Sequence, residues 1–370
     1  MLRLRRSEAG DTGRGLGMTG AAGGGPERAA PSSVEDLTGI LKGATEEQRV
    51  VNVVGGGTRQ GYGSPPPAAL VVEMTGLAGI EVWDPDDLTV TVGAGTPVAE
   101  LEAALAERAQ TAVLPEVPGA STVGGVISAG VSSLRRARLL GTRERMLEVR
   151  LVTGDGRVVR GGGRVVKNVS GYDLPRLVVG AFGSLGVITS VCLKLWPKPP
   201  ASATVAIGDI EAAKRVKRPL AVLERNGVVE VFLWGTPEEV IASSGRLGGQ
   251  VADGHRWPAD PEGPFRWSVR VPPALTGPAI DRLPNGWDYL AVHGAGDIRA
   301  ASHSADGAEG LRMWAEGSGG ALVVTDAPVG GLDGLDPWGS PPPGMEIQRR
   351  LIAQFDPGRV LNPGRLPGGL

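Results

Sequence analysis

The chain has only one cysteine, and this scarcity excludes several kinds of protein. With Cys192 alone among 370 residues, no intrachain disulfide can form, and no paired-cysteine zinc or iron–sulfur motif is present. Cys192 lies in the apolar run 187–196, where a thiol usually behaves as a small buried hydrophobic group. A single thiol favours a reducing compartment, so we expect a cytoplasmic protein.

Long apolar runs and an excess of either charge are also missing. The formal net charge is -2, which gives no overall field to attract nucleic acid or a membrane surface. No run approaches the ~18 apolar residues of a membrane helix, although a membrane-bound partner could still hold the protein at a membrane. The basic opening precedes a glycine-rich run, so we predict no export signal and expect residues 1–30 to be disordered.

The familiar nucleotide and hydrolase motifs are absent as well. The sequence contains no G-x-G-x-x-G in a strand–helix context and no G-x-x-x-x-G-K-[ST], which argues against a Rossmann dinucleotide site and a P-loop. It also lacks the H-E-x-x-H motif of zinc enzymes and the G-x-S-x-G motif of serine hydrolases. We therefore expect neither chemistry, and no metal site is predicted.

What the chain has instead is a set of glycine-rich segments. The first, VVNVVGGGTRQGYG at 50–63, is a short strand that runs into Gly55, Gly56, Gly57 and Thr58. Bare amides at a chain reversal suit an anion such as a pyrophosphate, and the alternative is an ordinary turn. If the loop holds a phosphate, Gly56→Val should weaken binding by filling the space of the ligand.

The second segment, 115–133, is nearly free of charge and dense in small residues. The hydroxyl groups of Ser121 and Thr122 stand beside Gly124 and Gly125. Such a stretch allows the close approach of a flat ligand, but it is equally suited to a helix packed tightly on a sheet, and the sequence leaves both interpretations open.

The surrounding elements follow an α+β pattern. Ser33 and Asp36 predict a capped helix, and the turn at 84–87 predicts an antiparallel pair of strands. Further strands are expected at 70–74, 147–153, 157–160 and 187–196, and further helices from Pro97 to about 108 and after Asp173 or Ser170.

Five arginines, Arg135, Arg136, Arg138, Arg143 and Arg145, follow the second segment without aromatic neighbours. We interpret them as a solvated loop paired with carboxylates rather than as a nucleic-acid surface, and a subunit or phosphate contact stays open.

Beyond Pro197 the composition changes, with frequent tryptophan and all three histidines. Strands at 228–234, 267–271 and 289–292 predict a second α+β domain, and a short helix at 347–351 should stop at Asp356. The tail then carries the sequence FDPGRVLNPGRL.

Taken together, the segments VGGGTRQGYG, PGASTVGGVISAG and GAFGSLGVITS, with the closing NPGR, resemble the FAD-binding family of the vanillyl-alcohol oxidase and para-cresol methylhydroxylase (PCMH) type. Within that family they are similar to the E subunits of bacterial glycolate oxidases. The resemblance implies a PCMH-type FAD-binding domain of two α+β subdomains at 31–199, a smaller α+β cap domain at 200–345, and a tail at 346–370 that returns to the FAD domain.

The resemblance also implies which residues contact FAD. They are Gly55, Gly56, Gly57, Thr58, Pro118, Gly119, Ser121, Thr122, Gly124, Gly125, Gly183, Gly186, Val187 and Ile188. Many relatives bind FAD covalently through a histidine near the first loop, but no histidine precedes His255 here, so we predict non-covalent FAD.

The chain departs from catalytic relatives in its late histidine motif, where it has only HGAGD at 293–297. Oxidation of a 2-hydroxy acid needs a base and a cation for the carboxylate, for which His293 and Arg299 are candidates. The alternative is that His293 is an ordinary residue at the end of a strand.

Three functions follow from the resemblance. The first is an FAD-binding subunit of a 2-hydroxy-acid (glycolate) oxidase or dehydrogenase complex, with a sister flavoprotein and an iron–sulfur subunit as partners. The second is a self-sufficient FAD-dependent oxidoreductase acting on another hydroxylated substrate. The third is a degenerate, non-catalytic scaffold, against which the intact glycine loops argue.

Overall fold

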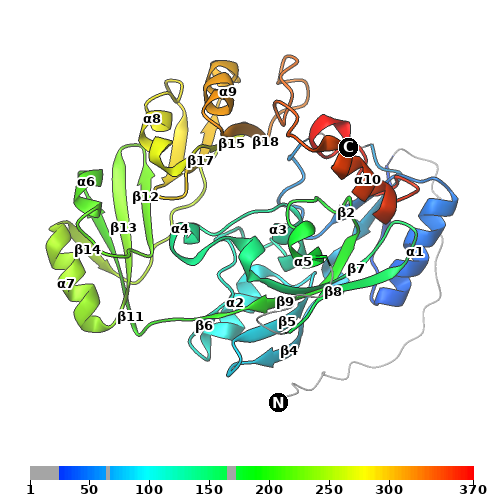
Figure 1. The fold of residues 1–370 in the computed structure, drawn as a ribbon, viewed down its shortest axis with the longest axis horizontal. Helices are drawn as coiled ribbons and strands as arrows, with labels where there is room; N and C mark the ends of the chain where they lie inside the picture. The colour runs from blue at the N-terminus through cyan, green and yellow to red at the C-terminus, as the bar shows by residue number, and fades with distance from the viewer. Residues whose placement is uncertain (1–24, 64–66, 165–171) are drawn as a thin grey trace.

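The computed structural model describes residues 25–63, 67–164 and 172–370 (Figure 1). Most of the predicted disordered segment 1–30 therefore lies outside the described residues. Its end needs a correction, because Glu27–Ala29 forms strand β1, which pairs in parallel with β3 (Leu70–Glu73). Ion pairs of Glu27 with Arg49 and of Arg28 with Glu73 hold this strand in place.

The first sheet has three parallel strands in the order β1-β3-β2, where β2 is Val51–Val54. Helix α1 (Val34–Glu46) buries Leu37 and Leu41 in the same core cluster as these strands. It begins as predicted, because the Ser33 hydroxyl accepts a hydrogen bond from the Asp36 amide at 3.0 Å.

The second sheet is antiparallel, with five strands in the order β4-β5-β9-β7-β8. Its strands are β4 (Ile80–Asp84), β5 (Thr89–Gly93), β7 (Met146–Val152), β8 (Val158–Gly162) and β9 (Val187–Lys194). The predicted antiparallel pair around the 84–87 turn is confirmed as β4 and β5. The helices of this part are α2 (Val98–Ala106), α3 (Val123–Ser128), α4 (Arg136–Leu139) and α5 (Leu174–Leu177).

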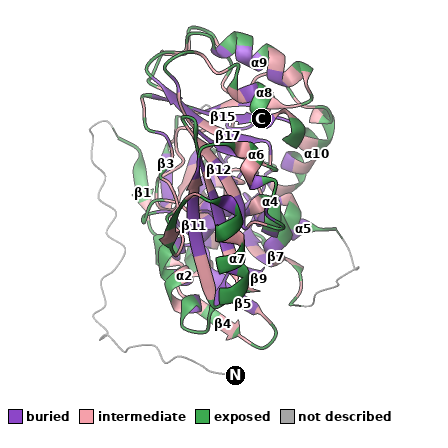
Figure 2. Ribbon diagram, turned by 90° about the vertical axis from the view of Figure 1, so that its left-hand side faces the viewer, coloured by how far each residue is buried: buried purple, intermediate pink, exposed green. Residues whose placement is uncertain are grey.

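The third sheet belongs to the later half and has eight antiparallel strands in the order β14-β11-β13-β12-β16-β17-β15-β18. Its strands are β11 (Ala201–Ile207), β12 (Ala221–Arg225), β13 (Val228–Gly235), β14 (Gln250–Asp253), β15 (Phe265–Arg270), β16 (Asp288–Val292), β17 (Asp297–Ser302) and β18 (Ala321–Asp326). Its helices are α6 (Ile210–Ala213), α7 (Pro237–Leu247), α8 (Thr276–Ile280) and α9 (Ala308–Gly317). Figure 2 shows buried strands beneath helices whose outer sides are exposed.

The first half of the chain ends with β10 (Trp196–Pro197), and the later half begins with β11. At this boundary β10 pairs with β6 (Gln110–Thr111) of the first half. The last helix, α10 (Met345–Phe355), returns to the first half, where Ile352 packs in a cluster with Ala181 and Leu185 (Figure 1). Among the described residues, no helix is both long and apolar enough to cross a membrane.

Burial corrects the prediction for the arginine run. Arg135 and Arg145 are 9% and 3% exposed, so the run is not simply a solvated loop. Arg135 donates to Glu116 at 2.7 Å, and the Arg145 guanidinium lies 5.6 Å from the Trp196 ring centroid. Cys192, in contrast, is 1% exposed, which confirms the expectation that it is buried.

Candidate functional site

A cavity in the first half brings the three glycine-rich segments together. We call it the glycine cavity. The predicted FAD contacts that line it are Gly55, Gly56, Gly57, Thr58, Thr122, Gly124, Gly125, Gly183, Gly186, Val187 and Ile188. Pro118, Gly119 and Ser121 are not among its lining residues. The lining also includes residues that the site prediction missed, of which the polar ones are Arg59, Gln60, Ser128, Asn362 and Arg365.

The first two segments pack directly against each other. The hydroxyl groups of Thr58 and Ser121 are hydrogen-bonded at 2.9 Å. A Cβ atom on Gly56 would lie 1.4 Å from the Ala120 carbonyl oxygen. Gly56 is therefore needed for the contact between the two loops. We predicted that a side chain at this position would fill the space of a ligand, whereas in the structure it would collide with the second loop.

The first loop nevertheless offers free donors to the cavity. Within the described chain, the amides of Gly55, Gly56 and Gly57 donate no backbone hydrogen bond. Gly57 has a φ of +71°, in the left-handed region that glycine adopts without strain. Unpaired amides on successive residues form the kind of concave site that binds anions.

The C-terminal tail holds the loops in place. The side-chain nitrogen Nδ2 of Asn362 donates to the Phe182 carbonyl at 2.9 Å. The side-chain oxygen Oδ1 of Asn362 accepts a hydrogen bond from the Val53 main-chain amide at 3.4 Å. Asn362 thus connects the first glycine-rich segment to the third. Sequence inspection noted the Asn-Pro-Gly-Arg motif but gave no sign of which loops it would reach.

Arg365 adds a buried positive charge to the same cavity. It is 3% exposed and donates to the Arg59 and Gln60 carbonyls at 2.8 and 3.1 Å. No carboxylate of the described chain lies within ion-pair distance, and its Nε atom has no acceptor. Burial lowers the pKa of Arg365 to about 10, because the charged form has lost water. A buried cation without a carboxylate fits an anionic ligand such as a pyrophosphate.

A second cavity adjoins the first through Arg59, which lines both. We call it the arginine cavity. It lies between the first half and the third sheet. Its charged lining residues are Arg59, Arg136, Arg266, Arg270, Arg299, Asp260 and Asp297, and Tyr62, Ser132 and Ser268 are among its neutral polar ones.

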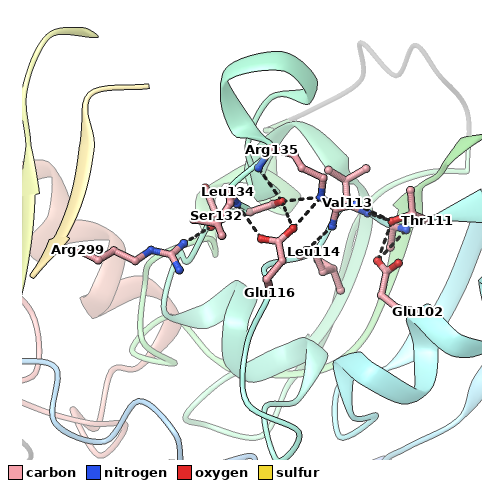
Figure 3. A network of polar contacts seen from close by, with 11 residues as sticks. Glu102, Thr111, Val113, Leu114, Glu116, Ser132, Leu134, Arg135 and Arg299 are labelled. Atoms are coloured by element: carbon pink, nitrogen blue, oxygen red, sulfur yellow. Dashed lines mark hydrogen bonds and ion pairs between the residues drawn. The ribbon is translucent and has the colours of Figure 1, made fainter. Parts of the chain in front are cut away.

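Arg299 crosses between the two halves of the chain in this cavity. Its guanidinium donates to an Asp260 carboxylate oxygen at 2.6 Å. It also donates to the Ser132 carbonyl at 3.0 Å (Figure 3). Burial alone would lower the pKa of Arg299, but the carboxylates of Asp260 and Asp297 raise it above its ordinary value. Arg299 is therefore a permanently charged group at the boundary between the halves.

The structure does not bring His293 to Arg299. The His293 ring nitrogen Nε2 is 2.8 Å from Glu224, which also accepts a hydrogen bond from the Tyr289 hydroxyl at 2.7 Å. His293 lines a different cavity, together with Ala137 and Pro273, and neither the glycine cavity nor the arginine cavity includes it. In the described part of the chain, no cluster of three or more His, Cys, Asp or Glu side chains could hold a metal ion.

Comparison with known proteins gives the site its context. Residues 28–162 match the family described as "FAD binding domain". The chain is 29% identical to glycolate oxidase subunit GlcE of Escherichia coli over 335 residues, which are 85% of this chain and 92% of that protein. It is 34% identical to D-lactate dehydrogenase of Archaeoglobus fulgidus over 48% of this chain and 40% of that protein. It is 31% identical to glycolate oxidase subunit GlcD of Bacillus subtilis over 53% of this chain and 45% of that protein.

The chain therefore spans most of the length of GlcE but less than half of the other two relatives. Among solved structures, an alkyldihydroxyacetonephosphate synthase shares the fold, with a TM-score of 0.63 at 14% identity, over 91% of this chain and 75% of that one. Residues 28–162 form an FAD-binding domain, and the chain is an FAD-binding oxidoreductase of the PCMH-type fold, related to glycolate oxidase subunits and to 2-hydroxy-acid dehydrogenases.

Proposed function

We propose that this chain is the FAD-binding subunit of a 2-hydroxy-acid oxidase or dehydrogenase complex that acts on glycolate. In this complex a sister flavoprotein completes the chemistry and an iron–sulfur subunit takes the electrons. The likeness to GlcE over most of both chains supports the assignment, and GlcE and GlcD are both named as subunits of a glycolate oxidase. FAD supplies the redox chemistry, and the protein supplies binding, orientation and electrostatics.

The observation that carries the cofactor assignment is Arg365 in the glycine cavity. The buried guanidinium without a carboxylate and the free amides of Gly55, Gly56 and Gly57 would together hold the pyrophosphate. Thr122, Gly124 and Gly125 would allow the rest of the dinucleotide to approach the backbone closely. Asn362 would keep the loops at the correct separation. Pro118, Gly119 and Ser121 would act behind this lining, since Ser121 hydrogen-bonds to Thr58.

We propose that FAD is bound without a covalent link. None of the described residues lining the glycine cavity is a histidine or a cysteine, the side chains that would most readily form such a link.

A sister subunit is proposed because the arginine cavity offers little to accept a proton. Its described lining contains no histidine. Its two carboxylates are both engaged, Asp260 with Arg299 and Asp297 with Arg136 at 3.8 Å. Arg299 could hold a substrate carboxylate, whereas His293 is turned toward Glu224 instead. The complex would work in the cytoplasm and reach a membrane, if at all, through a partner.

The test is to purify the chain alone and co-expressed with its candidate partner subunits, and then to record visible spectra before and after anaerobic addition of glycolate. We expect a flavin spectrum in both samples and bleaching only in the complex. Bleaching in the isolated chain would show a self-sufficient enzyme instead. A colourless chain that takes up no FAD would contradict both.

A matched pair of variants tests the cofactor contact. Arg365→Gln should weaken FAD binding at least about tenfold, because it removes the buried charge. Arg359→Gln, which changes an exposed arginine of the same tail, should leave FAD affinity unchanged. Equal affinities in the two variants would remove Arg365 from the site.

A further inference from the structure

Arg59 reaches from the first glycine-rich segment into the arginine cavity, where its guanidinium has few partners. Its side chain is 17% exposed, and its Nε atom is buried without an acceptor among the described residues. An Asp260 carboxylate oxygen lies 3.9 Å from one of its terminal nitrogens, which is too far for a hydrogen bond. A covered guanidinium with unused donors is costly unless another acceptor approaches it.

Arg299 is the other well-covered arginine of the cavity, with a side chain that is 14% exposed, and its donors are already in use. Its two terminal nitrogens donate to Asp260 and to the Ser132 carbonyl. The remaining arginines are more open to solvent, and each has a carboxylate nearby or opposite it in the sheet, which is Asp297 for Arg136 and Arg270, and Asp326 for Arg266. Arg59 therefore differs from the others as a covered arginine without a hydrogen-bond acceptor in the described chain.

Tyr62, on the same loop as Arg59, adds a neutral donor to this end of the cavity. It lines the arginine cavity but not the glycine cavity, and no described residue forms a hydrogen bond with its hydroxyl group. Its ring packs on Phe182, which lines the glycine cavity, with the ring centroids 5.6 Å apart. Burial raises the pKa of Tyr62, although nearby guanidinium groups, Arg59 among them, act in the opposite direction. The phenol therefore keeps its proton and can donate a hydrogen bond.

We infer that Arg59 and Tyr62 bind the single carboxylate of the 2-hydroxy acid at the inner end of the arginine cavity. The Arg59 guanidinium supplies charge and Tyr62 supplies a hydrogen bond, and the oxygens of one carboxylate can accept from both. The charge of Arg299, which also acts on the Tyr62 hydroxyl, adds to the attraction. This inference deepens the proposed function, on which it rests, because it names the residues that anchor glycolate. Arg59 also lines the glycine cavity, so the bound acid lies beside the site proposed for FAD.

Calorimetric titration at constant ionic strength and saturating FAD tests the inference, with glycolate as the ligand and glycolamide as its uncharged analogue. We expect glycolate to bind at least about tenfold more tightly than glycolamide. Arg59→Gln should abolish this preference. Tyr62→Phe, which keeps the ring on Phe182 and removes only the hydroxyl group, should weaken glycolate binding at least about fivefold. Its FAD affinity should stay within about twofold of the wild type, because Tyr62 does not line the glycine cavity.

Arg266→Gln is the matched control, because it removes a positive charge from the exposed rim of the same cavity. Its preference for glycolate should stay within about twofold of the wild type, since solvent and salt screen an exposed charge. Arg215→Gln, at an exposed position outside the cavity, should behave as the wild type does.

Four results of the titration would overturn the inference. They are equal affinities for glycolate and glycolamide, no binding of either, unchanged glycolate binding in Tyr62→Phe, and an equal loss of the preference in Arg266→Gln and Arg59→Gln. It is also overturned if Arg59→Gln loses FAD affinity but keeps the preference, because Arg59 would then serve the cofactor. The visible spectrum of the same samples reports separately on the proposed function. Absence of flavin, or its bleaching by glycolate in the isolated chain, contradicts that function whatever the affinities are.

Discussion

The Arg299 guanidinium donates a hydrogen bond to the Ser132 main-chain carbonyl at 3.0 Å, and this contact joins the third sheet to the FAD-binding half (Figure 3). The segment that carries Ser132 is itself fixed. The Glu116 carboxylate accepts hydrogen bonds from the Ser133 hydroxyl and the Leu134 amide, both at 2.8 Å. The segment that forms this wall of the arginine cavity is therefore held by Glu116 on one side and hydrogen-bonded to Arg299 on the other.

Replacement of Arg299 should weaken the contact between the third sheet and the FAD-binding half. Arg299→Met removes the hydrogen bond to Ser132 and leaves Asp260 with only the distant Arg59. We expect a loss of about 2 kcal/mol in the free energy of unfolding, less than for a fully buried pair because Asp260 is partly exposed. Urea unfolding of the FAD-containing protein measures this loss. Arg215→Gln should change stability by less than about 0.5 kcal/mol, and an equal loss in both variants would contradict the role of Arg299.

The loop contact at Gly56 leads to a second prediction. Gly56→Ala places a methyl group against the Ala120 carbonyl, so the first two segments must separate, at a cost of about 1–3 kcal/mol. FAD affinity should fall with it, because both segments line the glycine cavity. Gly208→Ala is the matched control, since nothing lies within 4 Å of its added Cβ and it lines neither the glycine cavity nor the arginine cavity. Fluorescence titration of the apoprotein with FAD should separate the two variants, and indistinguishable affinities would refute the packing argument.

His293 provides a test of the catalytic assignment made from sequence. Because its ring is paired with Glu224 and lines neither the glycine cavity nor the arginine cavity, His293→Gln should leave kcat/KM of the complex with glycolate within about twofold of the wild type. Loss of a general base would instead lower it by about 10²-fold or more. Steady-state kinetics of the complex decides between them.

The local elements of this fold could be predicted because short-range chemistry determines them. The Ser33 cap and the turn between β4 and β5 depend on residues within a few positions of each other, and both are where the pattern predicts them. The glycine-rich segments could also be recognised, because they occur together with the closing Asn-Pro-Gly-Arg motif, although each one alone would also suit a turn or a tightly packed helix.

The contacts that complete the site could not be predicted in the same way. Asn362 meets Val53 and Phe182 only after the tail has folded back across the first half. The burial of Arg135 likewise depends on Glu116, whose position the sequence does not reveal. A run of arginines normally lies in solvent, and only tertiary structure shows which of its members are covered. The position of His293 could not be predicted either, because it follows the end of β16 and its ring lies against Glu224 rather than in the arginine cavity.

Asp356 at the end of α10 predicts how stability depends on pH. The residue is 1% exposed, one carboxylate oxygen accepts from the Leu361 amide at 2.8 Å, and the other has no partner among the described residues. Burial raises the pKa of Asp356, although the hydrogen bonds from Leu361 and Val360 act in the opposite direction. A carboxyl group whose pKa is higher in the folded state contributes stability that is full below its unfolded pKa of about 3.9 and is lost as the pH rises through the folded value.

Asp356→Asn removes this titration and keeps an acceptor for Leu361. The stability of the variant relative to the wild type should therefore increase as the pH rises from about 4 to 7, with a slope of at most about 1.4 kcal/mol per pH unit. Urea unfolding across this range, with FAD present at a fixed saturating concentration, measures the difference. Asp86→Asn, at an exposed position, should stay parallel to the wild type. If the Asp356→Asn curve is parallel as well, the buried carboxyl group does not titrate differently in the folded protein, and its unpartnered oxygen carries no such cost.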